Sequence, residues 1–163
     1  IPGLAEHGIG AWEVLKNEQL ILGGNVLVVG GGMVGCEVCE HLLHNKRGPL
    51  QLTMIEMTDE IAAGMVVNEK VLVMDRLHKA QVQLLTNTKL EAVEASGVKL
   101  KVHGEALERH DFTHVVYATG SRSNTALASA LTKQDNVYVV GDAATVAQAL
   151  EAVRDATLAA MAI

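Results

Sequence analysis

Aromatic side chains are scarce in this chain of 163 residues: they make up 2% of it, with one Trp, two Tyr and one Phe. Proteins that bind single-stranded nucleic acid commonly stack bases on such side chains, so this composition disfavours that class of function. Positively charged residues are also outnumbered: the chain has 13 Lys and Arg residues and 19 Asp and Glu residues, which gives a formal net charge of -6. We therefore expect neither a nucleic-acid partner nor attraction to an anionic membrane.

Long apolar runs and cysteines are also few. No apolar stretch reaches the roughly 20 residues that span a bilayer, and no secretory signal is visible, so we expect no membrane association and a cytoplasmic location. The two cysteines, Cys36 and Cys39, form a CxxC, which invites a redox-dithiol interpretation. They fall inside a predicted helix, however, where packing cysteines are common. We favour the packing role.

A metal site is disfavoured as well. A tetrahedral zinc site would need two ligands beyond the CxxC cysteines. His41 and His44 lie three residues apart, which suits two ligands on one helix face, but no acidic partner accompanies them. The interpretation we favour is a solvated helix end, and we predict no metal ligands and no catalytic side chain.

The most informative stretch covers residues 25–56, NVLVVGGGMVGCEVCEHLLHNKRGPLQLTMIE. Four apolar residues lead into a run of three glycines, and a segment with helical character follows through Leu43. A second apolar run, residues 50–55, ends on Glu56. Strand, glycine-rich turn, helix, strand and acid is the order of elements that a dinucleotide site requires.

Each glycine in the turn has a physical task. Gly30 lets the chain reverse tightly at the strand end, where a positive φ would penalise a side chain. Gly32 leaves room for a pyrophosphate to approach the backbone, and Gly35 lets the helix press against the strand. The phosphates would then lie on the unpaired N–H groups at the helix start. The predicted pyrophosphate-binding residues are Gly30, Gly31, Gly32, Met33, Val34 and Gly35.

Glu56 indicates which dinucleotide is bound. A carboxylate at the tip of the second strand accepts hydrogen bonds from the ribose hydroxyls and repels a 2′-phosphate, which favours NAD(H) over NADP(H). No Arg or Lys lies between Glu56 and Lys70 to offset that repulsion. Met57, the next residue, could cover the adenine ring.

The remaining segments predict an α/β fold. Before the glycine turn we expect a loose stretch at Gly8 and Gly10 and a short helix over residues 11–19, with Trp12 and Leu15 facing inward. After the turn, the expected helices cover residues 66–79, with Val67, Val71, Met74 and Leu77 facing inward, and residues 143–163. The expected later strands cover residues 82–85, 89–95, 98–102, 106–109, 113–117 and 137–140. We predict a Rossmann-like parallel sheet with helices on both faces and a short antiparallel β-meander.

Three motifs carry a family resemblance: VVGGGMVGCE at 28–37, VVYATGSRSN at 115–124 and VYVVGDA at 137–143. With them the sequence resembles the flavoprotein disulfide reductase superfamily, which has two dinucleotide domains. Within it, the sequence is most similar to the C-terminal, NADH-binding part of NADH:flavin oxidoreductases of the 2-enoate reductase and 2,4-dienoyl-CoA reductase type. Ser123 departs from the proline that is common at its position in this motif.

The resemblance implies roles for further residues. Glu37 would lie near the nicotinamide, and Ala118, Thr119 and Gly120 would mark the crossing from the NADH domain back to the FAD domain. Asp142 would hydrogen-bond the ribityl chain of FAD, although a Gly-Asp after an apolar run can also simply cap the next helix. The family passes hydride from NADH to FAD, then electrons through an iron–sulfur cluster to FMN in a barrel domain that reduces an activated C=C bond.

The resemblance also divides the chain. Residues 1–24 would be a lead-in segment, residues 25–125 the NAD(H)-binding domain, and residues 126–163 the last strand and helix of the FAD domain. No second GxGxxG is present to hold FAD. We therefore expect an inactive fragment whose partners are NADH and the FAD and barrel domains of the same polypeptide.

Other interpretations stay open. The chain could be a non-enzymatic module that senses NAD(H) or binds a partner, or a Rossmann domain for another nucleotide. The apolar run 137–140 would lack a sheet in the isolated chain, and an unpaired strand edge is prone to pairing with another chain. We expect this run to join the chain's own sheet or that of a second copy.

Overall fold

The computed structural model describes residues 1–131, 134 and 136–162. The chain forms two compact units, Ile1–Thr119 and Gly120–Ile163. Each unit has its own elements and is described by itself.

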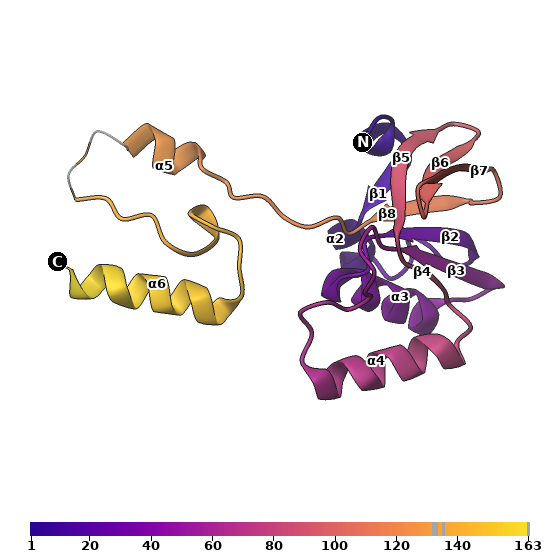
Figure 1. Ribbon diagram of the computed structural model, residues 1–163, viewed down its shortest axis with the longest axis horizontal. Coiled ribbons are helices and arrows are strands. Elements are labelled where there is room, and N and C mark those ends of the chain that lie inside the picture. Colours follow the sequence, from indigo (N-terminus) through magenta and orange to yellow (C-terminus); the bar gives the residue numbers. More distant parts are fainter. Residues whose placement is uncertain (132–133, 135, 163) are drawn as a thin grey trace. The chain divides into compact units, whose positions relative to one another are not determined.

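The first unit is built on a five-stranded parallel sheet with the strand order β1-β8-β2-β3-β4 (Figure 1). Its strands are β1 Gly8–Gly10, β2 Gly24–Val29, β3 Leu50–Ile55, β4 Gln83–Leu85 and β8 His114–Tyr117. This confirms the α/β fold with a parallel sheet. The expectation of a loose chain at Gly8 and Gly10 was wrong, because these residues pair in register with β8, from Gly8 opposite Val115 to Gly10 opposite Tyr117.

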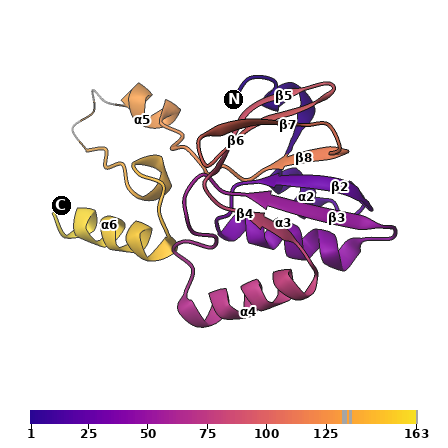
Figure 2. The same ribbon diagram turned by 45° about the vertical axis from the view of Figure 1, so that its right-hand side comes forward.

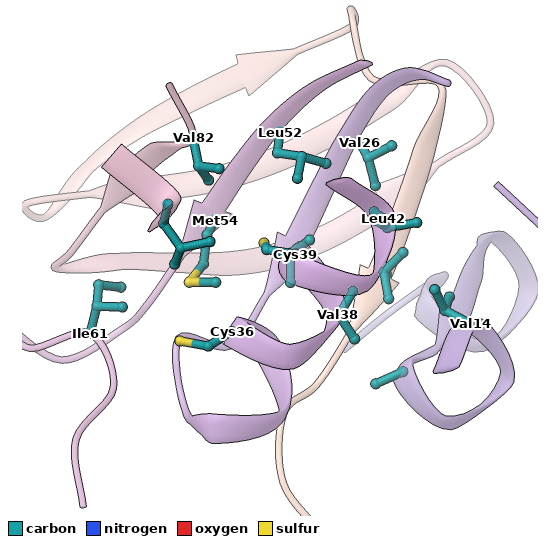
Figure 3. Close-up of a cluster of buried hydrophobic side chains, with 14 of the residues drawn as sticks. Val14, Val26, Cys36, Val38, Cys39, Leu42, Leu52, Met54, Ile61 and Val82 are labelled. Carbon is teal, nitrogen blue, oxygen red and sulfur yellow. The ribbon is translucent and has the colours of Figure 1, made fainter. Parts of the chain in front are cut away.

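Three helices cover one face of this sheet: α2 Ala11–Lys16, α3 Met33–Asn45 and α4 Val67–Lys79. The alternation of a strand sends Val26 and Val28 of β2 to this face, where they are fully buried with Val38 and Leu42 of α3. Figure 3 shows this cluster, with Cys36 and Cys39 among its buried side chains. Burying one such aliphatic side chain contributes about 1.5–3 kcal/mol, so this face stabilises the unit strongly.

The opposite face carries the predicted antiparallel meander. It consists of β5 Thr88–Glu94, β6 Gly97–Val102 and β7 Glu105–Arg109. Figure 2 shows the meander on one side of the parallel sheet and α3 and α4 on the other. Leu27 and Val29 of β2 pack here against Leu90 and Leu100, and the one-turn helix α1 Leu4–His7 adds Leu4. We predicted helices on both faces of the sheet, and on this face the only described helix that packs is α1.

Two helices of the first unit are rotated relative to the predicted orientation. In α2, Val14 is buried while Trp12 is 61% exposed, so the inward placement of Trp12 was wrong. In α4, Val73 and Leu77 are buried, but Val67 and Val71 are 74% and 62% exposed. Among the α4 residues that we predicted to face inward, only those in the C-terminal half of the helix contribute to the core.

The second unit contains α5 Ala126–Leu131, the 3₁₀ turn η1 Gly141–Ala143 and α6 Ala149–Met161. Residues 137–140 are extended but form no strand, which corrects the prediction: apolar β-formers become a strand only with a hydrogen-bonded neighbour, and no described strand pairs with them. They line, with Leu127 and Leu131, an apolar hollow of ≈ 600 Å³. The closing helix begins at Ala149, six residues later than expected. Among the described residues, no helix is both long and apolar enough to cross a membrane.

Candidate functional site

The carboxyl ends of three parallel strands meet around the glycine turn. The N–H of Gly30 donates to the carbonyl of Ile55 at 2.9 Å, which joins the ends of β2 and β3. The N–H of Ala118 donates to the carbonyl of Val29 at 2.8 Å, which joins the ends of β8 and β2. From β2 the chain passes to its neighbour β3 on one side, while β8, which comes later in the chain, pairs with β2 on the other side. The turn after β2 therefore lies where the strand order reverses. In open parallel sheets, ligands bind at this point.

Two glycines allow the chain to pack closely behind the turn. Gly30 has φ 106°, and a Cβ there would lie 2.5 Å from the carbonyl oxygen of Ala118. A Cβ on Gly35 would lie 1.9 Å from the carbonyl oxygen of Gly30. Neither position tolerates a side chain without backbone movement. The structure thus gives both glycines the geometry that the sequence predicted for a tight turn and a closely packed helix.

Gly32 differs from its neighbours because a Cβ at this position would meet nothing within 4 Å. It is the N-cap of α3, and the first bond into the helix runs from the N–H of Cys36 to the carbonyl of Gly32 at 3.1 Å. The earlier amides at this helix start, including those of Met33 and Val34, have no carbonyl of the preceding turn to bond. An open surface of outward N–H groups at a helix start suits a diphosphate, so the residues present fit this group.

The Glu56 carboxylate lies beside this opening. Its Oε2 accepts a hydrogen bond from the N–H of Gly31 at 2.8 Å, and its Oε1 accepts bonds from the N–H and hydroxyl of Thr58 at 2.9 and 3.0 Å. Burial by itself raises the pKa of Glu56, but these hydrogen bonds outweigh it and hold the pKa below its usual range. The carboxylate is therefore charged at neutral pH and fixed next to the glycine turn.

The loop after β3 forms a wall behind Gly31. The N–H of Ala62 donates to the Gly31 carbonyl at 2.6 Å, and a Cβ on Gly31 would lie 2.6 Å from Cδ1 of Ile61. Sequence reasoning missed Thr58, Ile61 and Ala62. A signal was present for Thr58 alone, since a hydroxyl residue two positions after an acid commonly bonds to it locally.

The other predicted cofactor residues are placed as follows. Met57 is 67% exposed beside Glu56, Glu37 is exposed on α3, and Ala118 and Thr119 follow β8 in the first unit. Gly120 and Asp142 belong to the second unit. The structure brings the glycine turn, Glu56 and Ala118 together.

Asp142 has a local partner. Its Oδ1 accepts a hydrogen bond from the N–H of Ala147 at 3.3 Å, in the loop that leads to α6. The N-cap of α6 is Gln148, so Asp142 does not cap that helix as one interpretation of the sequence expected. It stabilises the preceding loop instead.

The cysteines are buried and free. Burial, together with the nearby carboxylates of Glu40 and Glu37, raises the pKa of Cys36 to about 11, and burial also raises the pKa of Cys39. Both are therefore protonated at neutral pH, which opposes thiolate chemistry. The described residues contain no group of three or more His, Cys, Asp or Glu side chains placed to hold a metal ion.

This arrangement can hold a diphosphate with main-chain amides and a ribose with one carboxylate. The nicotinamide of a bound dinucleotide supplies the hydride chemistry, and the protein's part is to bind and orient it. The turn itself presents no side chain that must act as an acid or base.

Two curated proteins and a solved structure show what the chain is similar to. A bilirubin reductase from Mediterraneibacter gnavus (strain CC55_001C) is 36% identical over 137 residues, which cover 83% of this chain and 21% of that protein. A dihydrolipoyl dehydrogenase from Chlamydia pneumoniae is 31% identical over 130 residues, 77% of this chain and 25% of that protein. The chain thus spans about a quarter or less of these relatives.

The fold recurs in 6-hydroxypseudooxynicotine amine oxidase from Pseudomonas geniculata N1, with a TM-score of 0.82 and 23% identity over 99% of this chain and 25% of that one. The sequence also matches the family described as pyridine nucleotide-disulphide oxidoreductase, over residues 1–157. This span includes the glycine turn, Glu56, all of the first unit and most of the second. The chain therefore belongs to the pyridine nucleotide-disulphide oxidoreductase family.

Proposed function

We propose that this chain binds NADH and forms part of a flavin-dependent oxidoreductase, in which the nicotinamide passes hydride to FAD. The observation that carries the proposal is the Glu56 carboxylate, held 2.8 Å from the N–H of Gly31 and beside the open position at Gly32. Main-chain amides at the start of α3 would bind the pyrophosphate, and Glu56 would bind the hydroxyls of the adjoining ribose.

The proposed preference for NADH over NADPH follows from charge. Glu56 is ionised at neutral pH because its pKa is lowered, so it would repel a 2′-phosphate at the ribose. Lys70, the first cation after it in sequence, is already ion-paired with Glu60. A 2′-phosphate would therefore lie next to the fixed negative charge of Glu56. The next cation along the sequence, Lys70, would not offset this repulsion because it already pairs with Glu60.

The flavin part of the proposal is supported by the family and by the second unit. We propose that residues 126–163 are the last part of an FAD domain, with Asp142 toward the ribityl chain. Several apolar side chains of this unit are highly exposed, namely Leu127, Tyr138, Leu150, Val153 and Met161. Such a surface is typical of one that another part of a protein covers.

The acceptor is proposed from the resemblance. An iron–sulfur cluster and FMN in other domains would carry electrons to an activated C=C bond, as in 2-enoate reductases, and the 36% identical relative is itself named as a reductase. Because FAD would need those other domains, we propose that the chain alone binds NADH without turnover, and we propose a cytoplasmic setting.

A calorimetric titration of the chain with NADH and with NADPH tests this proposal. We expect NADH to bind at least about tenfold more tightly, which corresponds to roughly 1.4 kcal/mol. Glu56→Gln keeps the shape of the side chain but removes its charge, so it should weaken NADH binding and narrow the preference. Equal or tighter NADPH binding by the unmodified chain would contradict the assignment of Glu56.

A second candidate is a non-enzymatic NAD(H)-responsive interaction module. It is favoured by one observation, the exposed apolar side chains of Val67, Val71 and Leu72 on α4. Mass spectrometry under native conditions separates the candidates: retained NAD(H) with no further partner supports a cofactor domain, whereas a stoichiometric protein partner on α4 supports the module. Retention of a different nucleotide would support neither.

A further inference from the structure

Lys70 occupies an unexpected position on α4. It lies three and seven residues before the buried Val73 and Leu77, so it belongs to the stripe of the helix that faces the rest of the unit. Its side chain is 27% exposed and ion-paired with Glu60. On the same helix, Val67 and Val71 point into solvent. A cation therefore takes an inward position while apolar residues remain outside.

Glu60, the partner of Lys70, directly precedes the residues that back the glycine turn. Ile61 packs behind Gly31, and Ala62 donates its N–H to the Gly31 carbonyl at 2.6 Å. Ala62 has φ 56°, a left-handed conformation that costs free energy in a residue with a side chain. This strained loop persists only if its surroundings hold it, and the ion pair attaches it to α4.

The helix that carries Lys70 is itself fixed. Arg76 of α4 is ion-paired with Glu40 of α3, and Val73 and Leu77 are buried in the core that α3 shares. The positive charge of Lys70 acts on Cys36 in the first turn of α3, where it lowers the pKa of the thiol against the larger effect of burial.

We propose that the Glu60–Lys70 ion pair is a clasp that holds the β3–α4 loop against the glycine turn and thereby sets the affinity for the dinucleotide. Lys70 is a positioning residue, because it acts through Glu60, Ile61 and Ala62. The effect on affinity rests on the proposed function; the effect on the loop does not.

Breaking the clasp should loosen the loop with or without NADH. Partly exposed ion pairs contribute about 0.2–1 kcal/mol, so Lys70→Met should raise the Kd for NADH about 1.4- to fivefold. Glu60→Gln should do the same, and the two changes together should add little, since each removes the same interaction. The charge swap Glu60→Lys with Lys70→Glu should recover most of the affinity.

Hydrogen exchange of the Ala62 amide in the free protein gives an independent readout. It should accelerate about two- to fivefold in Lys70→Met and Glu60→Gln and return toward the original rate in the swap. The matched control is the Asp75–Lys79 pair on the same helix, which lies outside the loop. Lys79→Met should change neither Kd nor Ala62 exchange.

The outcomes separate this inference from the proposed function. If NADH does not bind the unmodified chain but Ala62 exchange follows the clasp, the proposed function fails and the clasp stands. If NADH binds and Lys70→Met changes neither Kd nor exchange, or the swap fails to recover either, the clasp is overturned.

Discussion

The two units of this chain differ in what holds them together. In Ile1–Thr119, each face of the parallel sheet has its own buried cluster, one with α2, α3 and α4 and one with the meander. In Gly120–Ile163, neither α5 nor α6 has a buried residue among those described. The first unit can therefore specify its structure from its own sequence. In the second unit, the apolar side chains of the described helices are largely exposed.

Hydrogen exchange should show the largest difference between the units. Amides of β2, β3 and α3 should be protected by a factor of at least about 10³, because they exchange only through unfolding that costs roughly 5 kcal/mol or more. Amides of α6 should exchange close to the rate of an unfolded chain. Strong protection of α6 amides in the isolated monomeric chain would contradict the expected difference in stability between the two units.

Leucine truncations in the two units should differ by several kcal/mol. Leu42 of α3 is 1% exposed and Leu150 of α6 is 75% exposed. Leu42→Ala leaves a cavity and should lower the free energy of unfolding by about 2–5 kcal/mol. Leu150→Ala should change it by less than about 0.5 kcal/mol. Urea denaturation measures both, and a comparable loss for Leu150→Ala would show that α6 is packed.

The glycine turn allows a smaller and sharper test inside the first unit. Gly35→Ala places a Cβ against the Gly30 carbonyl and should cost about 1–3 kcal/mol of stability. Gly32→Ala points into open space and should cost at most about 1 kcal/mol, from a poorer helix cap. If the turn binds the pyrophosphate, Gly32→Ala should nevertheless weaken NADH binding. Unchanged binding in a folded Gly32→Ala variant would argue against that site.

The smallest expected effect concerns the cysteines. Cys36 and Cys39 are buried and the pKa of Cys36 is raised to about 11, so only about one Cys36 in a thousand is ionised at pH 8. Neither thiol should react appreciably with iodoacetamide at pH 8 unless urea is added. Rapid labelling of the folded protein would revive the redox interpretation of the CxxC.

The features that could be predicted from the sequence are those that depend on residues close together in the chain. Gly30 and Gly35 have the predicted geometry, and Glu56 directly follows β3 as expected, because a strand end, a tight turn and a helix start each follow from a few consecutive residues. The meander was also predicted, since Ser96-Gly97 and His103-Gly104 mark its turns. Which face of the sheet it covers was not predicted, because that depends on long-range packing.

The features that were not predicted from the sequence depend on contacts between residues that are far apart in the chain. β1 has only three residues, two of them glycine, and becomes a strand through pairing with β8. Residues 137–140 have strand composition, but none of the described strands pairs with them. Ala62 reaches Gly31, and Lys70 of α4 pairs with Glu60, only because the loop after β3 folds back onto the glycine turn. Spacing along the chain does not encode these contacts.

In the proposed binding mode, the turn after β2 binds a dinucleotide through main-chain amides and Glu56 binds the adjoining ribose. Amide chemical-shift mapping during an NADH titration locates the bound dinucleotide on the chain. We predict the largest shifts at Gly31, Gly32, Met33 and Val34, with smaller ones at Glu56 and Thr58. Saturable shifts confined to the second unit, or none at the turn under millimolar NADH, would contradict the claim.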